Sequence, residues 1–526
     1  MPGLPTMYLT LPVHRMLREG ADRPFVVLGE RHSTRRRFAD RVARLGAVLR
    51  GLGVLAGDRI GMLALNSDRY LEYYFGTWWA GAAVNPVNIR WSAPEIAYSL
   101  DDCDTRVLLV DDTFLPLVPD LRRLSSSLTT VIYTGDGSVP EGMLGYEALL
   151  EQAQPVPDAV RGDEDLAGVM YTGGTTGRPK GVMLSHRALF SGSIGSLASV
   201  PRRSDDVVSL YAAPMFHIAG LAIAVQNALR LCRQVVLPAF APAAVLSAIE
   251  SERVTEMFLV PTMLHFVLED PAFESKDLSS LELLIYGAAP MNSALLERAL
   301  ARLPHVDFIH VYGMTETVGA ITALPQWYHS AEGQRSGKLR SAGRPLLFAE
   351  ICIIDDRGAP VLAGTVGEIS ARGPMLMSGY WNRSEETAAA LREGWMRTGD
   401  GGFMDEEGFV TVVDRIKDMI ISGGENIYSA EVENAILLLE GVAMCGVIGV
   451  PDERWGERVH AVVVPAPGVT LTQEAVITHC RTLIAGYKCP TSVEFRSALP
   501  LSPVGKVLKY ELRAPFWLQQ TQASSL

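Results

Sequence analysis

The sequence predicts an α/β protein: a large N-terminal domain of two layered α/β subdomains and a small β-rich subdomain, then a small α+β C-terminal domain. Through most of the chain, short apolar runs alternate with helical periodicity, as in parallel sheets covered by helices. From about residue 346 the strands become shorter and turn-separated. The last roughly 110 residues are domain-sized. We therefore expect boundaries near 1–165, 166–345, 346–414 and 419–526.

The first subdomain begins with a helix and a strand separated by glycines. Residues 39–50 have helical periodicity and end at Gly51 and Gly53, because glycine terminates helices readily. A strand is expected at 59–65, and Asp68 is placed to begin the next helix. Further apolar runs at 107–110 and 131–133 favour a largely parallel sheet, and a Pro- and Asp-containing stretch at 154–165 would close the subdomain.

The second subdomain begins with a strand at 166–171 and carries most of the unusual segments. Ser185 offers a side-chain cap for a following helix. Five more apolar runs read as strands, and three of them lead into polar or glycine-bearing segments, which places several candidate site segments at one edge of a sheet. These strands are expected at 207–210, 235–237, 257–260, 283–286 and 308–312.

The β-rich subdomain and the C-terminal domain follow. Strands are expected at 350–354, 368–370 and 409–412. In the C-terminal domain a helix after Thr472 carries apolar residues on one face and ends at Gly486.

Composition narrows the class of protein. With 48% hydrophobic and 20% charged residues the chain is globular, and a formal charge of −12 argues against nucleic-acid binding. The triplet 35–37 is the local exception, and we interpret it as a solvated helix start capped by Thr34 rather than an anionic-membrane contact. Six cysteines without CxxC pairing suggest reduced thiols in a cytoplasmic protein. The apolar stretch 73–87 is too short and interrupted to cross a membrane, so we expect no transmembrane segment.

A glycine- and hydroxyl-rich loop at 171–181, between an apolar strand and a helix, is the most distinctive segment. Glycines let backbone N–H groups point at an anion, and threonine hydroxyls and a lysine add donors, so the loop is interpreted as a phosphate cradle. It is not a Walker A motif, because Gly181 follows the lysine where serine or threonine would be needed. A plain surface turn is the alternative. The predicted ligands are Thr172, Gly173, Gly174, Thr175, Thr176, Gly177 and Lys180.

Two segments that end strands carry further chemistry. Within 312–317, Tyr312 offers a ring to stack on a purine, Thr315 a hydroxyl for the α-phosphate, and Glu316 a hard oxygen ligand that suits magnesium. The alternative for Glu316 is an ordinary carboxylate at a helix start. The small residues Gly287, Ala288, Ala289 and Pro290 form a plausible shelf for a flat base, although any tight turn has this composition.

Other candidates are weak when taken singly. His217 follows a strand, but a histidine beside phenylalanine is often a packing residue. Asp400 offers two acceptor oxygens for ribose hydroxyls, but an aspartate after glycine is usually a turn residue. The charged run 414–418 would ordinarily be solvated, as would Lys506 near the C-terminus.

Taken in order, these segments resemble the adenylate-forming superfamily of acyl-CoA synthetases, luciferases and non-ribosomal adenylation domains, over nearly the whole chain. The resemblance implies a mobile C-terminal domain joined by a hinge at 415–418, with Lys417 at the pivot. It implies that the 171–181 loop binds the pyrophosphate half of ATP, and that Lys506 catalyses adenylation together with Thr315, Glu316 and His217. The resemblance also implies the ATP-binding residues Gly287, Ala288, Ala289, Pro290, Tyr312, Gly313, Met314, Thr315, Asp400, Arg415 and Lys506, the magnesium ligands Thr176 and Glu316, and the CoA-tunnel residues Ser422, Gly423, Gly424 and Glu425.

The implied activity is an ATP-dependent acyl-CoA synthetase. A carboxylic acid would attack the α-phosphate of Mg²⁺-bound ATP, release pyrophosphate, and then pass from AMP to coenzyme A. The implied acyl pocket is lined by His217, Ala219, Gly220, Val311 and Gly313.

The small residues at 219 and 220 are expected to leave room on one wall, whereas Val311 would shorten the floor, so we expect a medium-chain, branched or aryl-alkanoic acid. Two alternatives are a stand-alone enzyme that loads a carrier protein and a non-catalytic nucleotide-binding homologue. The chain is expected to be a monomer or homodimer.

Overall fold

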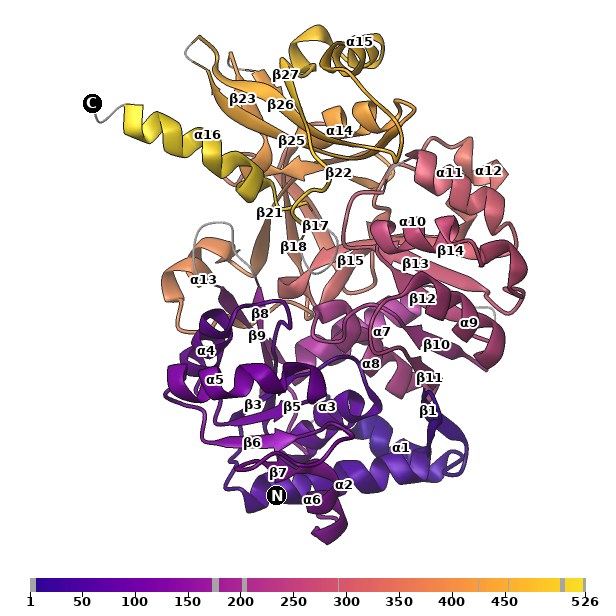
Figure 1. Ribbon diagram of the computed structural model, residues 1–526, viewed down its shortest axis with the longest axis vertical. Coiled ribbons are helices and arrows are strands. Elements are labelled where there is room, and N and C mark those ends of the chain that lie inside the picture. Colours follow the sequence, from indigo (N-terminus) through magenta and orange to yellow (C-terminus); the bar gives the residue numbers. More distant parts are fainter. Residues whose placement is uncertain are drawn as a thin grey trace.

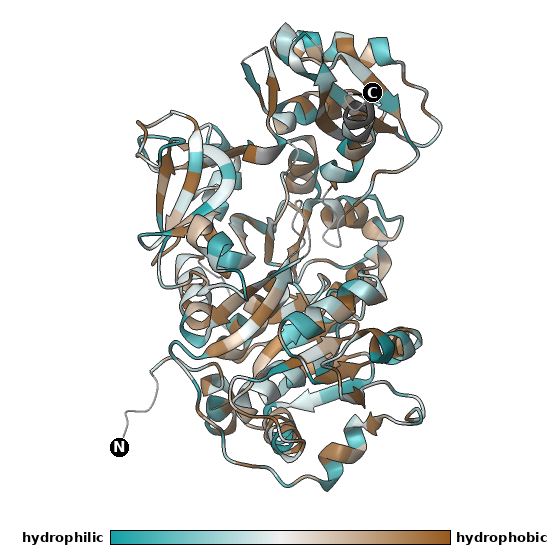
Figure 2. Cartoon of the chain, turned by 90° about the vertical axis from the view of Figure 1, so that its left-hand side faces the viewer, coloured by the Kyte–Doolittle hydropathy of each residue, from teal (hydrophilic) through white to brown (hydrophobic). Residues whose placement is uncertain are grey.

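The computed structural model describes residues 6–172, 179–200, 206–291, 293–423, 425–452, 454–501 and 507–523. Two large sheets and the helices around them build the body of the molecule, and the chain after residue 418 forms a separate layer at the top of Figure 1. Hydrophobic residues gather on the interior strands and hydrophilic residues at peripheral helices and loops (Figure 2). The expected α/β architecture is confirmed.

The first large sheet has eight strands in the order β19-β9-β8-β4-β3-β5-β6-β7. The strands from β8 to β7 pair in parallel, whereas β9 and β19 are antiparallel additions at one edge. The bounds are β3 Arg59–Leu63, β4 Ala83–Pro86, β5 Val107–Val110, β6 Thr130–Tyr133, β7 Leu144–Gly145, β8 Leu166–Thr172, β9 Lys180–Ser185 and β19 Gly379–Tyr380.

The second large sheet has nine strands in the order β16-β15-β14-β13-β12-β10-β11-β1-β2. Its central strands are parallel and its outer strands antiparallel. The bounds are β1 Pro24–Leu28, β2 Arg31–Thr34, β10 Val208–Tyr211, β11 Arg233–Val236, β12 Glu256–Leu259, β13 Leu283–Gly287, β14 Asp307–Met314, β15 Gly319–Leu324 and β16 Arg344–Pro345.

Two smaller antiparallel-rich sheets complete the structure. One has the order β17-β18-β21-β20 with β22 on β21, and the other has the order β24-β23-β26-β25 with β27 on β26. The bounds are β17 Glu350–Ile354, β18 Gly367–Arg372, β20 Leu391–Arg392, β21 Trp395–Met404, β22 Val410–Arg415, β23 Ile420–Ser422, β24 Glu425–Ile427, β25 Val442–Asp452, β26 Gly456–Pro465 and β27 Ser492–Phe495.

Helices α2, α3, α7 and α8 form the middle layer, which contributes to one apolar core shared with both large sheets. Helices α9, α10 and α11 cover the outer face of the second sheet, and α4 and α5 that of the first. The helices are α1 Leu11–Arg18, α2 Arg35–Gly51, α3 Asp68–Ala80, α4 Ala93–Asp102, α5 Val118–Leu124, α6 Tyr146–Gln152, α7 His186–Ser199, α8 Ile218–Arg230, α9 Pro242–Glu252, α10 Pro261–Glu269, α11 Ser293–Arg302, α12 Ala331–Gln334, α13 Ser384–Ala390, α14 Ser429–Leu437, α15 Gln473–Leu483 and α16 Lys509–Ala523.

The structure corrects the interpretation of the basic triplet. Thr34 does cap α2, accepting from the backbone N–H of Arg37 at 3.2 Å. Arg35, however, is buried and donates to the carbonyls of Glu19 and Leu231, so it joins chain segments instead of facing solvent.

The apolar stretch 73–87 contains the end of α3, where Gly81 adopts the left-handed conformation (φ 92°). No helix within the described ranges is long and apolar enough to cross a membrane.

Candidate active site

Three predicted nucleotide-binding residues meet where β14, β21 and β22 come together. The Tyr312 hydroxyl donates to Asp400 Oδ2 at 2.7 Å, and Arg415 Nε lies 2.7 Å from Asp400 Oδ1. Asp400 and Arg415 are also register partners across β21 and β22. Burial, reinforced by the Asp400 carboxylate, raises the pKa of Tyr312, so its hydroxyl stays protonated as a donor.

Glu316 lies in the turn that follows β14 and is only 6% exposed. Its Oε1 accepts a hydrogen bond from the Tyr380 hydroxyl at 2.9 Å. Burial raises the pKa of Glu316, while the Tyr380 bond and the charge of Arg415 oppose that rise. Within the described residues no basic side chain forms a salt bridge with Glu316, so a cation would lower the cost of burying its charge.

Close backbone approaches explain the glycines beside these residues. A Cβ on Gly313 would lie 1.6 Å from the carbonyl oxygen of Gly319, and a Cβ on Gly287 would lie 2.2 Å from that of Val311. Ala288 follows in the left-handed conformation, with φ 64°, which is uncommon outside glycine. The strand ends that carry Tyr312 and the predicted base shelf are therefore packed backbone to backbone.

The predicted phosphate cradle at 171–181, here called the phosphate loop, joins two strands, not a strand and a helix as expected. Strands β8 and β9 pair as an antiparallel hairpin, with Thr172 opposite Lys180 at the end where the loop joins them. The helix begins only after β9, where Ser185 caps α7 by accepting from the N–H of Ala188 at 3.1 Å. The predicted ligands Gly173, Gly174, Thr175, Thr176 and Gly177 lie outside the described residues.

The residues predicted to line an acyl pocket lie at the start of α8 and on β14. His217 is the N-cap residue of α8, and its ring lies 4.1 Å from that of Phe216. The expectation that Gly220 leaves room in the pocket wall is wrong. A Cβ on Gly220 would lie 2.5 Å from Met215 Cα, so the backbone of Met215 already fills that space. Ala219 is partly buried against the apolar core of the second sheet.

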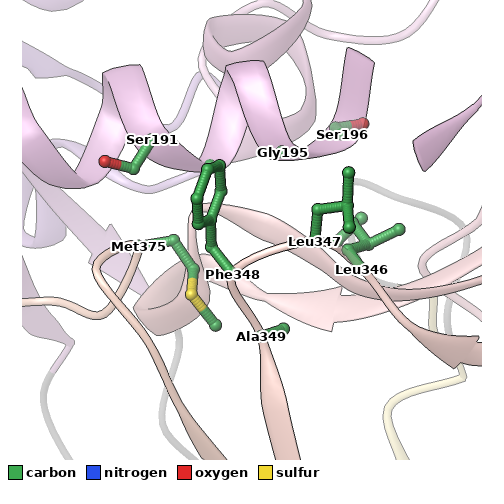
Figure 3. Close-up of a pocket in the computed structure, with 10 residues that line it drawn as sticks. Ser191, Gly195, Ser196, Leu346, Leu347, Phe348, Ala349 and Met375 are labelled. Atoms are coloured by element: carbon green, nitrogen blue, oxygen red, sulfur yellow. The ribbon is translucent and has the colours of Figure 1, made fainter. Parts of the chain in front are cut away.

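The Val311 side chain packs against an apolar cluster. Its Cγ2 would lie 2.9 Å from a Cβ at Gly287, so the side chain projects toward the predicted shelf. The cluster behind it includes Ile309, Ala320 and Leu346. A cavity of about 10 Å³, roughly the space of one water molecule, adjoins this cluster between α7 and Phe348 (Figure 3).

In the C-terminal layer, Ser422 pairs with Glu425 across a tight β-hairpin. Gly423 has φ 60° and its N–H donates to the carbonyl of Trp455 at 2.8 Å. A Cβ on Gly423 would lie 2.7 Å from the Trp455 ring, so this backbone approach also requires glycine. Gly424 lies outside the described residues.

The side chain of Lys417 and all of Lys506 likewise lie outside the described residues. Leu501 and Val507, which lie on either side of the segment that is not described, form an antiparallel bridge. Near the start of α16, burial and a hydrogen bond to the Glu511 carboxylate raise the pKa of Tyr510.

Tyr380 is the site residue that sequence reasoning missed. Its partners come from elements far along the chain: Glu316 accepts from its hydroxyl, and Lys180 Nζ lies 5.1 Å from its ring centroid. The glycine before it, at the edge strand β19, is the one local signal, and it indicates close packing rather than chemistry.

Two family models match the chain. The AMP-binding enzyme model matches residues 13–381, and the model of the C-terminal domain of AMP-binding enzymes matches residues 431–506. The chain belongs to the AMP-binding enzyme family. The resemblance to adenylate-forming enzymes is thereby confirmed.

Individual relatives cover nearly the whole chain. A feruloyl-CoA synthase from Amycolatopsis sp is 43% identical over 90% of this chain and 92% of its own. A fatty acid–[acyl-carrier-protein] ligase from Streptomyces coeruleorubidus is 37% identical over 90% of both chains. Among solved structures, an anthranilate CoA ligase in complex with anthranoyl-AMP has a TM-score of 0.89, with 27% identity over 99% of both chains.

Proposed function

We propose that this AMP-binding enzyme is an ATP-dependent acyl-CoA ligase. In the first step a substrate carboxylate oxygen attacks the α-phosphorus of ATP, and the bond to pyrophosphate breaks. In the second step the thiol of coenzyme A, having lost its proton, attacks the acyl carbonyl and AMP leaves. The observation that carries the proposal is the meeting of Tyr312, Asp400 and Arg415 at one point, with Glu316 on the turn directly after β14.

Each of these groups has a distinct part in the first step. The Asp400 carboxylate accepts from the ribose hydroxyls, Arg415 orients that carboxylate, and the Tyr312 ring stacks on the adenine above the Gly287 shelf. Thr172 and Lys180 stand at the mouth of the phosphate loop, where their donors meet the departing pyrophosphate. Orienting the reactants in this way supplies much of the rate acceleration.

Glu316 fits a magnesium ion that arrives with ATP. A buried carboxylate with one oxygen already bonded can offer its other oxygen to a hard cation. Phosphate oxygens and water would supply most of the ligands of such an ion. Thr176 is the second proposed ligand. When bound, magnesium offsets the negative charge of the phosphates.

The small C-terminal domain serves both steps in this proposal. Its Lys506 approaches the α-phosphate in the first step. Rotation about the hinge at 415–418 then exchanges that lysine for the Gly423 hairpin, which lines the path of coenzyme A.

The packing behind Val311 favours medium-chain, branched or aryl-alkanoic acids over long straight chains. Val311 and the cluster of Ile309, Ala320 and Leu346 close the floor of the pocket, and the adjoining cavity holds no more than about one water molecule. A long straight chain would have to displace packed side chains, which is costly.

Acid-dependent exchange of pyrophosphate into ATP tests the first step, and CoA-dependent AMP formation tests the second. We expect both reactions with phenylpropanoate or octanoate. Absence of exchange across a broad panel of carboxylic acids would refute the proposal.

A carrier-protein ligase is the second candidate, favoured by the similarity to such an enzyme from Streptomyces coeruleorubidus. Supplying coenzyme A and a phosphopantetheinylated carrier protein in parallel assays decides between them. We expect the thioester to form on coenzyme A, in keeping with the glycine hairpin at Gly423. Its formation on the carrier protein alone would favour the second candidate.

We also propose a cytoplasmic location, since all six cysteines are free thiols.

A further inference from the structure

The segment 377–383, here called the strap, touches both halves of the nucleotide site. The N–H of Met377 donates to the carbonyl of Glu316 at 2.8 Å. Three residues on, β19 pairs with β9, and the N–H of Trp381 donates to the carbonyl of Gly181 at 2.7 Å. The strap therefore connects the turn that carries the acidic residue to the strand that follows the phosphate loop.

The side chain of Tyr380 makes the same connection. Its hydroxyl donates to Glu316 Oε1 at 2.9 Å, and its ring lies under the ammonium of Lys180, 5.1 Å from the centroid. Tyr380 is 9% exposed, so solvent screens neither of these contacts strongly. An aromatic face attracts a cation without neutralising it.

The far end of the strap is anchored to the last turn of α4. Trp381 Nε1 donates to the carbonyl of Asp102 at 2.8 Å, and the hydroxyl of Tyr171, the first residue of the phosphate loop, donates to Asp102 Oδ2 at 2.7 Å. The guanidinium of Arg59 covers the Trp381 ring at 4.9 Å. One short helix end therefore fixes both the strap and the base of the phosphate loop.

Lys180 and Glu316 carry opposite charges, and in the proposed function both act on the phosphates of one nucleotide. A direct ion pair between them would use up both charges. In the described part of the chain they form no such pair, and Tyr380 contacts each of them. A phenol hydroxyl satisfies one carboxylate oxygen, leaves the other oxygen available, and carries no charge of its own.

We propose that Tyr380 is a positioning residue that holds the Glu316 carboxylate and the Lys180 ammonium apart, so that one meets the metal and the other the phosphates of the same nucleotide. This rests on the proposed function. The inference gives the strap a part in ATP binding, which no pattern in the sequence around residues 377–383 indicates.

The test is binding of ATP, measured by isothermal titration calorimetry with and without Mg²⁺. Tyr380→Phe removes the hydroxyl and keeps the ring, so Mg²⁺–ATP should bind about tenfold more weakly while Mg²⁺-free ATP changes by less than about twofold. Tyr380→Leu removes both contacts and should weaken both.

Tyr146→Phe is the matched control, because Tyr146 also donates to a buried carboxylate, Glu72 Oε2, at 2.8 Å, away from the site. It should leave both affinities unchanged. Wild-type affinities in Tyr380→Phe, or equal loss with and without Mg²⁺, would overturn the inference while leaving the proposed function intact. If the wild-type protein itself failed to bind ATP, the proposed function would fail instead.

Discussion

Shortening Val311 should lengthen the acids that the enzyme accepts. Val311→Ala removes two methyl groups from the side chain that projects toward the Gly287 shelf, in front of the cluster formed with Ala320 and Leu346. Alanine keeps the strand backbone unchanged, which glycine would not.

The magnitude follows from the apolar surface that the substrate would bury. Each additional methylene is worth about 0.8 kcal/mol, or roughly a fourfold gain in kcat/KM. Two methylenes in the vacated space therefore give about fifteenfold in favour of a substrate longer by two carbons. The cavity left when no such substrate is bound should lower the free energy of unfolding by about 1–2 kcal/mol.

The assay compares kcat/KM along a series of straight-chain acids from six to twelve carbons. Val235→Ala is the control, because Val235 is buried on β11, which β13, β12 and β10 separate from the strand β14 that carries Val311. It should cost similar stability without changing the preferred length. An unchanged preference in Val311→Ala, or the same shift in the control, would show that Val311 does not set the depth of the pocket.

Two further predictions concern buried charges. Lys509 Nζ lies 2.8 Å from the buried carboxylate of Glu433. Lys509→Met should therefore lower the free energy of unfolding, measured by urea denaturation, by about 3–5 kcal/mol, and adding Glu433→Met should restore part of that loss. Strictly additive effects of the two substitutions would refute a direct coupling. Burial lowers the pKa of His186 to about 4, so its stabilising contribution is present above about pH 6.5 and is lost as the pH falls toward 4. His186→Gln should therefore flatten the curve of unfolding free energy against pH between these values. An unchanged slope would contradict this role of His186.

Local sequence patterns were sufficient to predict the α/β architecture. The strand expected at 350–354 is β17, and the one expected at 283–286 is β13 with one more residue. Apolar runs bounded by turns report burial directly, so these elements depend little on distant parts of the chain. The helix expected at 39–50 is part of α2, which begins at Arg35 directly after its Thr34 cap, as the interpretation of the basic triplet as a helix start predicts.

Features that depend on contacts between distant parts of the chain could not be predicted from the sequence. The phosphate loop was expected to lead into a helix, yet β9 intervenes because it pairs with both β8 and β19, and β19 comes some 200 residues later. Gly220 shows the same limit, since a small residue reads equally as open space or as close packing until Met215 is seen against it. Tyr380 has no local pattern that would announce its contacts with Glu316 and Lys180.

In the proposed function, Lys506 of the C-terminal domain completes a nucleotide site built on the large domain. Lys506→Ala, assayed separately for pyrophosphate exchange and for thioester formation from supplied acyl-adenylate, tests it most directly. We expect exchange to fall by at least about a hundredfold while thioester formation stays within a few-fold of the wild type. Equal loss of both steps, or undiminished exchange, would contradict the claim.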